Sequence, residues 1–212
     1  WQDLRVCALL GEGASGHIYQ ARHPSAPEGL ALKIFKGAIT SDGFKVDVCA
    51  NAEFIEEMDA IRDSGAEQVG LFRTEFLHLE DPDGSEDWLA ECYTKAVKAM
   101  APGEIIFRTL DIGGDKVDPH ASGEPEPNPF LGWRGIRVSL GRQDLFRKQL
   151  RALLRAACHG RAGIMFPMVC GVEEVRAARA LLDQCASELM AEGLKIPEDI
   201  QIGAMIEIPS AA

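Results

Sequence analysis

The chain lacks the features that would assign it to several large classes of protein. Its 212 residues contain no apolar run near the roughly 20 residues needed to cross a bilayer, and no basic-then-apolar signal at the N-terminus. The formal net charge of −11 argues against general binding to nucleic acids or anionic membranes, because phosphate groups need a basic face. The six cysteines include no Cys-x-x-Cys pair, which argues against a zinc site or a disulfide framework. We therefore expect a cytoplasmic protein without nucleic-acid or membrane partners.

The N-terminal stretch combines three apolar segments with a glycine-rich turn. Gly11, Gly13 and Gly16 lie between the first two segments, and Lys33 lies in the third. Such a turn covers nucleotide phosphates in proteins where a lysine on the third strand reaches them. A strand rather than a helix is predicted after the glycines, which argues against a dinucleotide-binding fold. These four residues are a weak candidate nucleotide site.

Residues 4–37 resemble the first three strands of a protein-kinase N-lobe, through the three glycines and the lysine. The resemblance then stops, because no histidine-arginine-aspartate catalytic loop and no Asp-Phe-Gly metal motif follow. A kinase needs those parts to hold magnesium and to orient the nucleophile. We expect a vestigial or fused segment over residues 1–43, with turn residues near its end marking a junction to a second domain over 44–212.

From residue 44 onward, apolar segments alternate with amphipathic ones. Strands are expected over residues 45–50, 68–72, 104–107, 163–168 and 201–206, and helices over 52–64, 88–100, 145–158 and 172–190. This alternation predicts βα units and a parallel sheet. We expect an α/β fold, namely an incomplete (β/α)8 (TIM) barrel of about five βα units after a short β-rich N-terminal segment.

Residues with functional potential stand at the C-terminal ends of the expected strands: Asn51, Arg73, Arg108, Met168 and Glu207. In a parallel α/β barrel these ends converge on one face, which carries the site. The two arginines and Lys116 could neutralise a phosphate and a carboxylate, and Glu207 with another carboxylate could hold Mg²⁺. Such a site suits phosphoryl transfer. For Arg73 or Glu207 taken singly, a structural salt bridge remains the alternative.

Five motifs stand out from about residue 46 to the end: GLFRTEFL at 70–77, RTLDIGGDK at 108–116, NPFLGWRGIR at 128–137, IMFPMV at 164–169 and MIEIPSAA at 205–212. Together they resemble the phosphoenolpyruvate (PEP)-binding barrel of the phosphoenolpyruvate–protein phosphotransferase family, enzyme I of the bacterial sugar phosphotransferase system. Several long motifs in the family's order make this resemblance specific. Pyruvate, phosphate dikinase and PEP synthase share the barrel but are less similar.

The resemblance implies that Arg73 and Arg108 grip the substrate phosphate, with Arg134 and Lys116 nearby. It implies that Glu207 is one Mg²⁺ ligand and that PEP is the substrate. In the family, the phosphoryl group passes to a histidine on a separate domain and then to the histidine phosphocarrier protein. The full-length family also implies a possible homodimer.

The chain departs from the family pattern in several places. The Gly-Thr-Asn-Asp motif with the second Mg²⁺ ligand, a later arginine and the cysteine thought to protonate the product are absent from the sequence. No histidine lies in a recognisable phosphoacceptor motif: His17, His23, His78, His120 and His159. We therefore assign no catalytic residue and expect a partial barrel that does not turn over alone.

Two readings besides a partial PEP-dependent phosphotransferase or its dikinase-type relative remain open. One is a nucleotide-binding, pseudokinase-like fusion, which ATP protection of Lys33 from amine labelling would support. The other is a non-catalytic assembly protein whose exposed strands pair with a partner. The size of the protein in solution distinguishes the last reading from the others.

Overall fold

The computed structural model describes two compact units, Trp1–Cys49 and Ala50–Ala212. The backbone is described over residues 5–13, 16–23, 26–34, 38–39, 45–46, 49–81, 84–113 and 131–211, and side chains from residue 49 onward within these ranges.

An antiparallel three-stranded sheet forms the first unit. Its strands are β1 (Arg5–Gly13), β2 (Gly16–His23) and β3 (Ala26–Ile34), in the order β1-β2-β3. The predicted series of strand, glycine turn, strand, loop and strand is therefore present. Two further short strands, β4 (Ala38–Ile39) and β5 (Lys45–Val46), pair antiparallel with each other.

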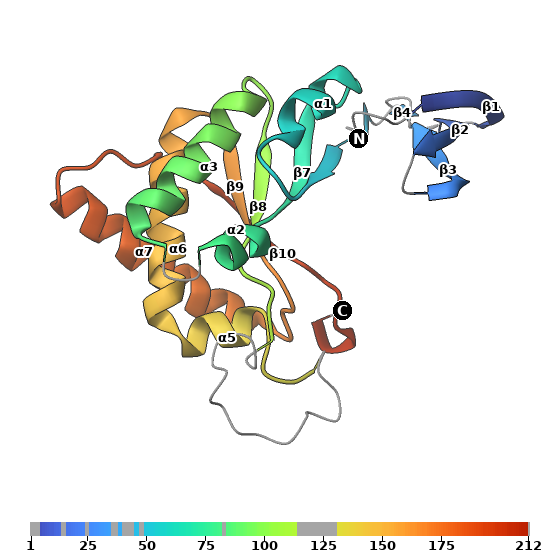
Figure 1. Ribbon diagram of the computed structural model, residues 1–212. Coiled ribbons are helices and arrows are strands. Elements are labelled where there is room, and N and C mark those ends of the chain that lie inside the picture. Colours follow the sequence, from blue (N-terminus) through green and yellow to red (C-terminus); the bar gives the residue numbers. More distant parts are fainter. Residues whose placement is uncertain are drawn as a thin grey trace. The chain divides into compact units, whose positions relative to one another are not determined.

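A five-stranded sheet organises the second unit. Its strands are β6 (Cys49–Ala52), β7 (Gln68–Arg73), β8 (Ile105–Arg108), β9 (Ala162–Phe166) and β10 (Gln201–Ala204). They lie in sequence order across the sheet, and the pairs β7–β8, β8–β9 and β9–β10 are parallel (Figure 1). The predicted α/β fold with a parallel sheet is confirmed. A barrel of five units is not confirmed, because the described strands form an open sheet.

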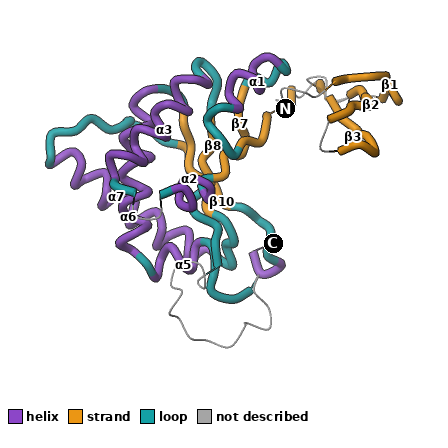
Figure 2. Tube along the Cα trace, in the orientation of Figure 1, coloured by secondary structure: helices purple, strands orange, loops and turns teal. Residues whose placement is uncertain are grey.

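Helices connect successive strands of this sheet. They are α1 (Glu57–Asp63), α2 (Glu75–Glu80), α3 (Glu86–Met100), α5 (Ile136–Gly141), α6 (Gln143–Ala156) and α7 (Val172–Ala191), with the 3-10 turns η1 (Ala157–His159) and η2 (Pro209–Ala211). The three longest helices, α3, α6 and α7, lie on one side of the sheet (Figure 2). Within the described ranges, no helix is long and apolar enough to cross a membrane.

Local sequence explains where α3 begins and which strand face it covers. Ser85 caps α3 by accepting a hydrogen bond from the Trp88 amide at 3.1 Å, as favoured at helix N-termini. Buried Tyr93 of α3 then packs on Phe107 of β8, with ring centroids 5.1 Å apart, and Phe107 packs on Phe72 of β7 at 5.2 Å. Because side chains alternate along strands, the residues that follow these two phenylalanines face the other side of the sheet.

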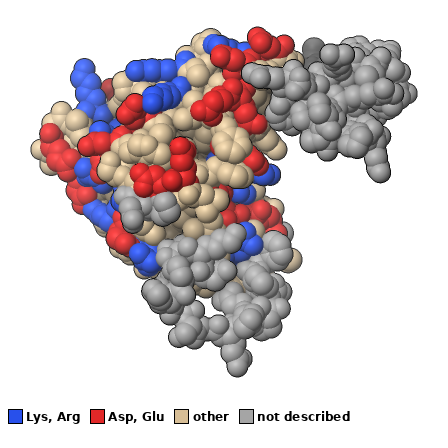
Figure 3. All heavy atoms as spheres, viewed as in Figure 1, with Lys and Arg blue, Asp and Glu red and all other residues tan. Residues whose placement is uncertain are grey.

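Ion pairs tie α6 to the helices on either side. Arg151 donates to Glu86 of α3 at 2.5 Å and to Glu192, just after α7, at 2.7 Å. Figure 3 shows that both signs of charge occur across the helical side of the molecule rather than one sign alone. The helical layer behind the sheet is therefore held by polar contacts at its rim as well as by its apolar core.

His78 of α2 makes the stability of this unit sensitive to acid. Burial, with a smaller contribution from the nearby positive charge of Lys148, lowers its pKa from 6.5 to about 4. Its Nε2 atom is buried beside a small cavity that Ser139 and Phe146 also line, and no described residue forms a hydrogen bond with it. The unfolded chain therefore takes up a proton near pH 6.5 while the folded chain resists until about pH 4. Folding stability is lost as pH falls through this window.

We expect the His78→Leu variant to lose less stability than the wild type on acidification. Between pH 7 and pH 5 the free energy of unfolding of the wild type should fall by about 2 kcal/mol more than that of the variant, measured by urea denaturation at both pH values. His159→Leu, which removes an exposed histidine of η1, is the matched control for the loss of an imidazole. Parallel pH profiles for the wild type and His78→Leu would contradict this assignment.

Candidate functional site

Two arginines end neighbouring strands at the same level of the sheet. Arg73 of β7 and Arg108 of β8 are register partners, directly after the partnered Phe72 and Phe107. Since the phenylalanines face the helices, both arginine side chains leave the opposite face at the carboxyl edge. This edge is where open and closed parallel α/β sheets place their ligand sites.

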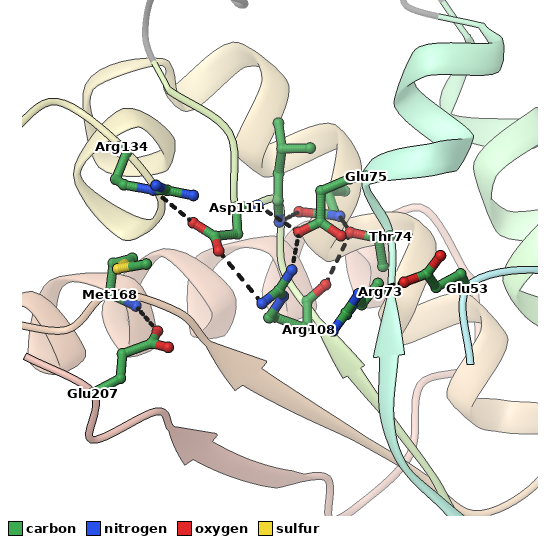
Figure 4. Close-up of polar contacts among 11 residues, drawn as sticks. Glu53, Arg73, Thr74, Glu75, Arg108, Asp111, Arg134, Met168 and Glu207 are labelled. Carbon is green, nitrogen blue, oxygen red and sulfur yellow. Dashed lines mark hydrogen bonds and ion pairs between the residues drawn. The ribbon is translucent and has the colours of Figure 1, made fainter. Parts of the chain in front are cut away.

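Arg108 is held between two carboxylates. Its Nη2 atom donates to Oε1 of Glu75 at 2.9 Å, and its Nη1 atom lies 3.4 Å from Oδ2 of Asp111 (Figure 4). The same Glu75 oxygen accepts a hydrogen bond from the Asp111 backbone amide at 2.9 Å. The side chains of Arg108, Glu75 and Asp111 are only 13%, 12% and 6% exposed, respectively. The contacts among them therefore lie away from bulk water and fix their mutual orientation.

Arg134 joins this cluster from a loop distant in sequence. Its Nε atom donates to Oδ1 of Asp111 at 3.2 Å, so Asp111 bridges Arg108 and Arg134 (Figure 4). Backbone contacts fix the loop: Gly113 and Arg134 form an antiparallel bridge, and the Gly135 amide donates to the carbonyl of Ile112 at 3.2 Å. The cluster therefore contains two arginines around one buried carboxylate.

Arg73 has its own carboxylate partner. Its Nη1 atom donates to Oε1 of Glu53, the residue that follows β6. Glu53 is itself positioned through its backbone amide, which donates to Glu57 at 2.7 Å at the start of α1. Each of the two strand-end arginines is thus oriented by a different set of acids (Figure 4).

Glu207 lies three residues beyond the end of β10 and is exposed. Its Oε1 atom accepts a hydrogen bond at 2.8 Å from the backbone amide of Met168, a residue with a φ of 55° after β9. The loop of Arg134 adjoins this pair, because a Cβ on Gly135 would lie 2.8 Å from the Cβ of Met168. Among the described residues, no group of three or more His, Cys, Asp and Glu side chains could hold a metal by itself.

The structure brings together most of the residues that the sequence marked. Arg73, Arg108 and Arg134 gather at the carboxyl edge, and the contact of Met168 places Glu207 beside the Arg134 loop. Lys116 lies outside the described residues. Asn51 lies within β6 rather than at its end, and Glu53 is the residue that contacts the site.

The candidate nucleotide-binding residues of the first unit lie on its three-stranded sheet. Gly13 pairs with Gly16 at the β1–β2 turn, while Gly11 and Lys33 occupy positions opposite Ile18 on either side of β2. The backbone register therefore places the turn and the lysine on adjoining strands. Whether they bind a nucleotide stays a sequence-based prediction.

The acids that orient the arginines were not singled out from the sequence. Glu53, Glu75 and Asp111 each follow a strand by one to three residues. That shared position, an acid just past a strand end, is the signal that would have found them. Their pairing with particular arginines depends on the strand order, which a linear motif does not contain.

In a comparison with known proteins, a family model and individual relatives indicate the same kind of protein. A family model described as PEP-utilising enzyme, PEP-binding domain, matches residues 28–212. A phosphoenolpyruvate-protein phosphotransferase from Lactococcus lactis subsp. cremoris is 46% identical over 201 residues, which cover 93% of this chain and 34% of the relative. Proteins of the same name from Mycoplasma capricolum and Haemophilus influenzae are each 45% identical, over 85% and 82% of this chain and 32% and 31% of their own lengths.

The chain thus spans about a third of the length of these curated relatives. The match to the Lactococcus protein leaves only 7% of this chain outside the alignment, which is fewer residues than the 43 assigned to the N-terminal segment. Part of that segment is therefore shared with the relative.

Proposed function

This chain belongs to the PEP-utilising enzyme family through its PEP-binding domain, and from this premise we propose that Arg73 and Arg108 bind the phosphate of PEP. We further propose that Arg134 lies near the bound substrate and that Lys116 contributes a compact positive charge. The complete protein would then be a PEP–protein phosphotransferase, which transfers the phosphoryl group to a protein histidine and on to the histidine phosphocarrier protein.

One observation carries the proposed phosphate site. The Nε atoms of Arg73 and Arg108 are buried and find no hydrogen-bond partner among the described residues, although both guanidinium groups are already held by carboxylates. A buried donor without an acceptor is costly, and a phosphate oxygen supplies a charged acceptor. Two such donors on register-paired strand ends support an anion site at this edge.

The surrounding acids fit a role in orientation rather than in binding. Glu75 and Asp111 hold Arg108 and so reduce the entropy lost when it meets a substrate. They also balance its charge in the absence of substrate. Because phosphoryl transfer depends mainly on positioning and charge neutralisation, this arrangement supports polarisation of the PEP phosphate toward transfer.

The donor set is compatible with Mg²⁺ in the presence of substrate. Mg²⁺ is commonly held by one or two carboxylates together with substrate phosphate and water, and exposed Glu207 offers one carboxylate beside the Arg134 loop. When bound, Mg²⁺ would neutralise part of the phosphate charge. We propose Glu207 as its single ligand among the described residues.

Calorimetric titration tests the proposal. PEP with Mg²⁺ should bind the 212-residue chain at one site, and ATP with Mg²⁺ should not compete with it. Binding that is absent, or that ATP displaces while protecting Lys33 from amine labelling, would contradict a PEP site at the strand ends.

We expect the Glu207→Gln variant to lose the Mg²⁺ dependence of PEP binding. An amide oxygen at this position can still accept the Met168 hydrogen bond, so the loop should stay in place while the charge that attracts the cation is lost. The ratio of the PEP affinities measured with and without Mg²⁺ should be about 10-fold smaller in the variant than in the wild type. Calorimetry under both conditions measures this ratio.

Glu174→Gln provides the matched control for this measurement. Glu174 likewise accepts a backbone hydrogen bond, from the Cys170 amide at 2.7 Å, but we assign it no role at the site. It should retain the full Mg²⁺ effect. An unchanged Mg²⁺ effect in Glu207→Gln would exclude Glu207 as the ligand.

A further inference from the structure

Gln149 is a polar side chain in the middle of an otherwise apolar helix face. It lies in α6 between residues such as Phe146, Leu150 and Leu153, which pack in the core, and it is itself only 1% exposed. A buried amide requires both acceptors and donors to be satisfied, so an apolar residue of similar size would be the simpler choice for packing alone. The partners of Gln149 therefore indicate what the amide does.

Two of its three partners belong to the ends of β7 and β8. The Oε1 atom accepts a hydrogen bond from the Leu110 backbone amide at 3.1 Å, and the Nε2 atom donates to the Thr74 hydroxyl at 3.0 Å. The third partner is the Tyr93 hydroxyl of α3, which accepts from Nε2 at 3.2 Å. A single amide thus contacts two separate strand-end loops and one helix of the core.

Thr74 continues this connection into the candidate phosphate site. Its hydroxyl, which is completely buried, donates to the backbone carbonyl of Arg108 at 2.9 Å while accepting from Gln149. The next residue, Glu75, contacts both the Arg108 guanidinium and the Asp111 amide. The other branch, through the Leu110 amide, holds the residue directly before Asp111. Both acids that orient Arg108 are therefore adjacent in sequence to a partner of Gln149.

We propose that Gln149 is a positioning residue for PEP binding, an inference that rests on the proposed function. It fixes the loops after β7 and β8 relative to each other, so that Glu75 and Asp111 hold Arg108 in the orientation that receives the phosphate. The role requires an amide, because the Leu110 amide needs an acceptor while the Thr74 hydroxyl, already donating to a carbonyl, needs a donor. Neither a carboxylate nor an apolar side chain meets both demands.

Three substitutions separate this role from a contribution to the core. Gln149→Leu removes every hydrogen bond of the amide, and Thr74→Val removes only the branch through the hydroxyl. Tyr93→Phe is the matched control, because it removes one hydrogen bond of the same amide and keeps both strand-end partners of Gln149. Each variant is measured for melting temperature and, by calorimetry, for affinity toward PEP with Mg²⁺.

We expect Gln149→Leu and Thr74→Val each to weaken PEP binding by about 10-fold, the loss that corresponds to one poorly replaced hydrogen bond. The double variant should bind no more than about 10-fold more weakly than the wild type, because both changes break the same connection. Tyr93→Phe should lower the melting temperature yet keep its affinity within about two-fold. Amide hydrogen exchange at Leu110 and Asp111 should accelerate in Gln149→Leu and not in Tyr93→Phe.

The outcomes distinguish this inference from the proposed function. A wild-type chain that does not bind PEP would overturn the proposed function and the role of Gln149 with it. If the wild type binds and Gln149→Leu keeps the affinity of Tyr93→Phe, only the positioning role is overturned. Should Gln149→Leu fail to fold, Thr74→Val decides the matter, because an unchanged affinity in that variant would also overturn the inference.

Discussion

Replacement of Arg108 by methionine is expected to abolish tight binding of PEP, with a loss in affinity of about 100-fold or more. Two effects add in this variant. The phosphate loses a buried charged donor. Glu75 also loses the cation that neutralises it and Asp111 keeps only Arg134 among the described residues, so the remaining negative charge repels the substrate. Calorimetric titration with PEP and Mg²⁺ measures the loss directly.

Controls separate this loss from a general loss of folding. Arg108→Lys keeps the positive charge but cannot contact both carboxylates and the phosphate through a planar fork, so we expect intermediate affinity. Arg179→Met removes an exposed arginine of α7 whose ion-pair partner is Asp183, and its affinity should equal that of the wild type. Circular dichroism checks that all variants remain folded. Wild-type affinity in folded Arg108→Met would exclude this residue from the site.

Replacement of Gly135 by alanine should damage both stability and binding. Gly135 has a φ of 55° and a ψ of −129°, a combination that side chains disfavour, and a Cβ here would lie 2.8 Å from the Cβ of Met168 and 3.3 Å from a carboxylate oxygen of Asp111. Backbone strain and this overlap should lower the free energy of unfolding by roughly 3 kcal/mol. Displacement of the adjoining loop should also move Arg134 away from Asp111 and weaken PEP binding.

A nearby glycine supplies the comparison for this substitution. Gly171 has an extended backbone, and apart from its chain neighbours no described residue has an atom within 4 Å of the Cβ that alanine would add. Gly171→Ala should therefore unfold at nearly the wild-type urea concentration. If Gly135→Ala were as stable as Gly171→Ala and bound PEP normally, close packing of the Arg134 loop against Met168 would not matter to the site.

Residues at strand ends could be predicted from sequence because they depend on short-range patterns. Arg73 and Arg108 each follow a short apolar run, and the alternation of strands and helices implied that their ends share one edge. The expected strand over residues 163–168 proved shorter, since β9 ends at Phe166 and the chain turns at Met168. This turn directs the Met168 amide to Glu207, a contact that an uninterrupted strand would not make.

Other parts of the site could not be predicted because they depend on long-range pairing. Apolar neighbours at helical spacing put Gln149 on the buried face of α6, but nothing local to the helix identifies Thr74 or Leu110 as its partners. Helix α2 was missed because it has only six residues and no side-chain hydrogen bond at its N-cap. Its position is set by the strand end before it rather than by a local signal.

A crystal structure of the chain with PEP and Mg²⁺ tests the central claim most directly. The account predicts that the phosphate lies at the carboxyl edge of the sheet, with its oxygens within hydrogen-bond distance of the Nε atoms of Arg73 and Arg108 and with the cation between the phosphate and Glu207. A phosphate bound at the glycines of β1 and β2 instead, with both Nε atoms still lacking an acceptor, would contradict it.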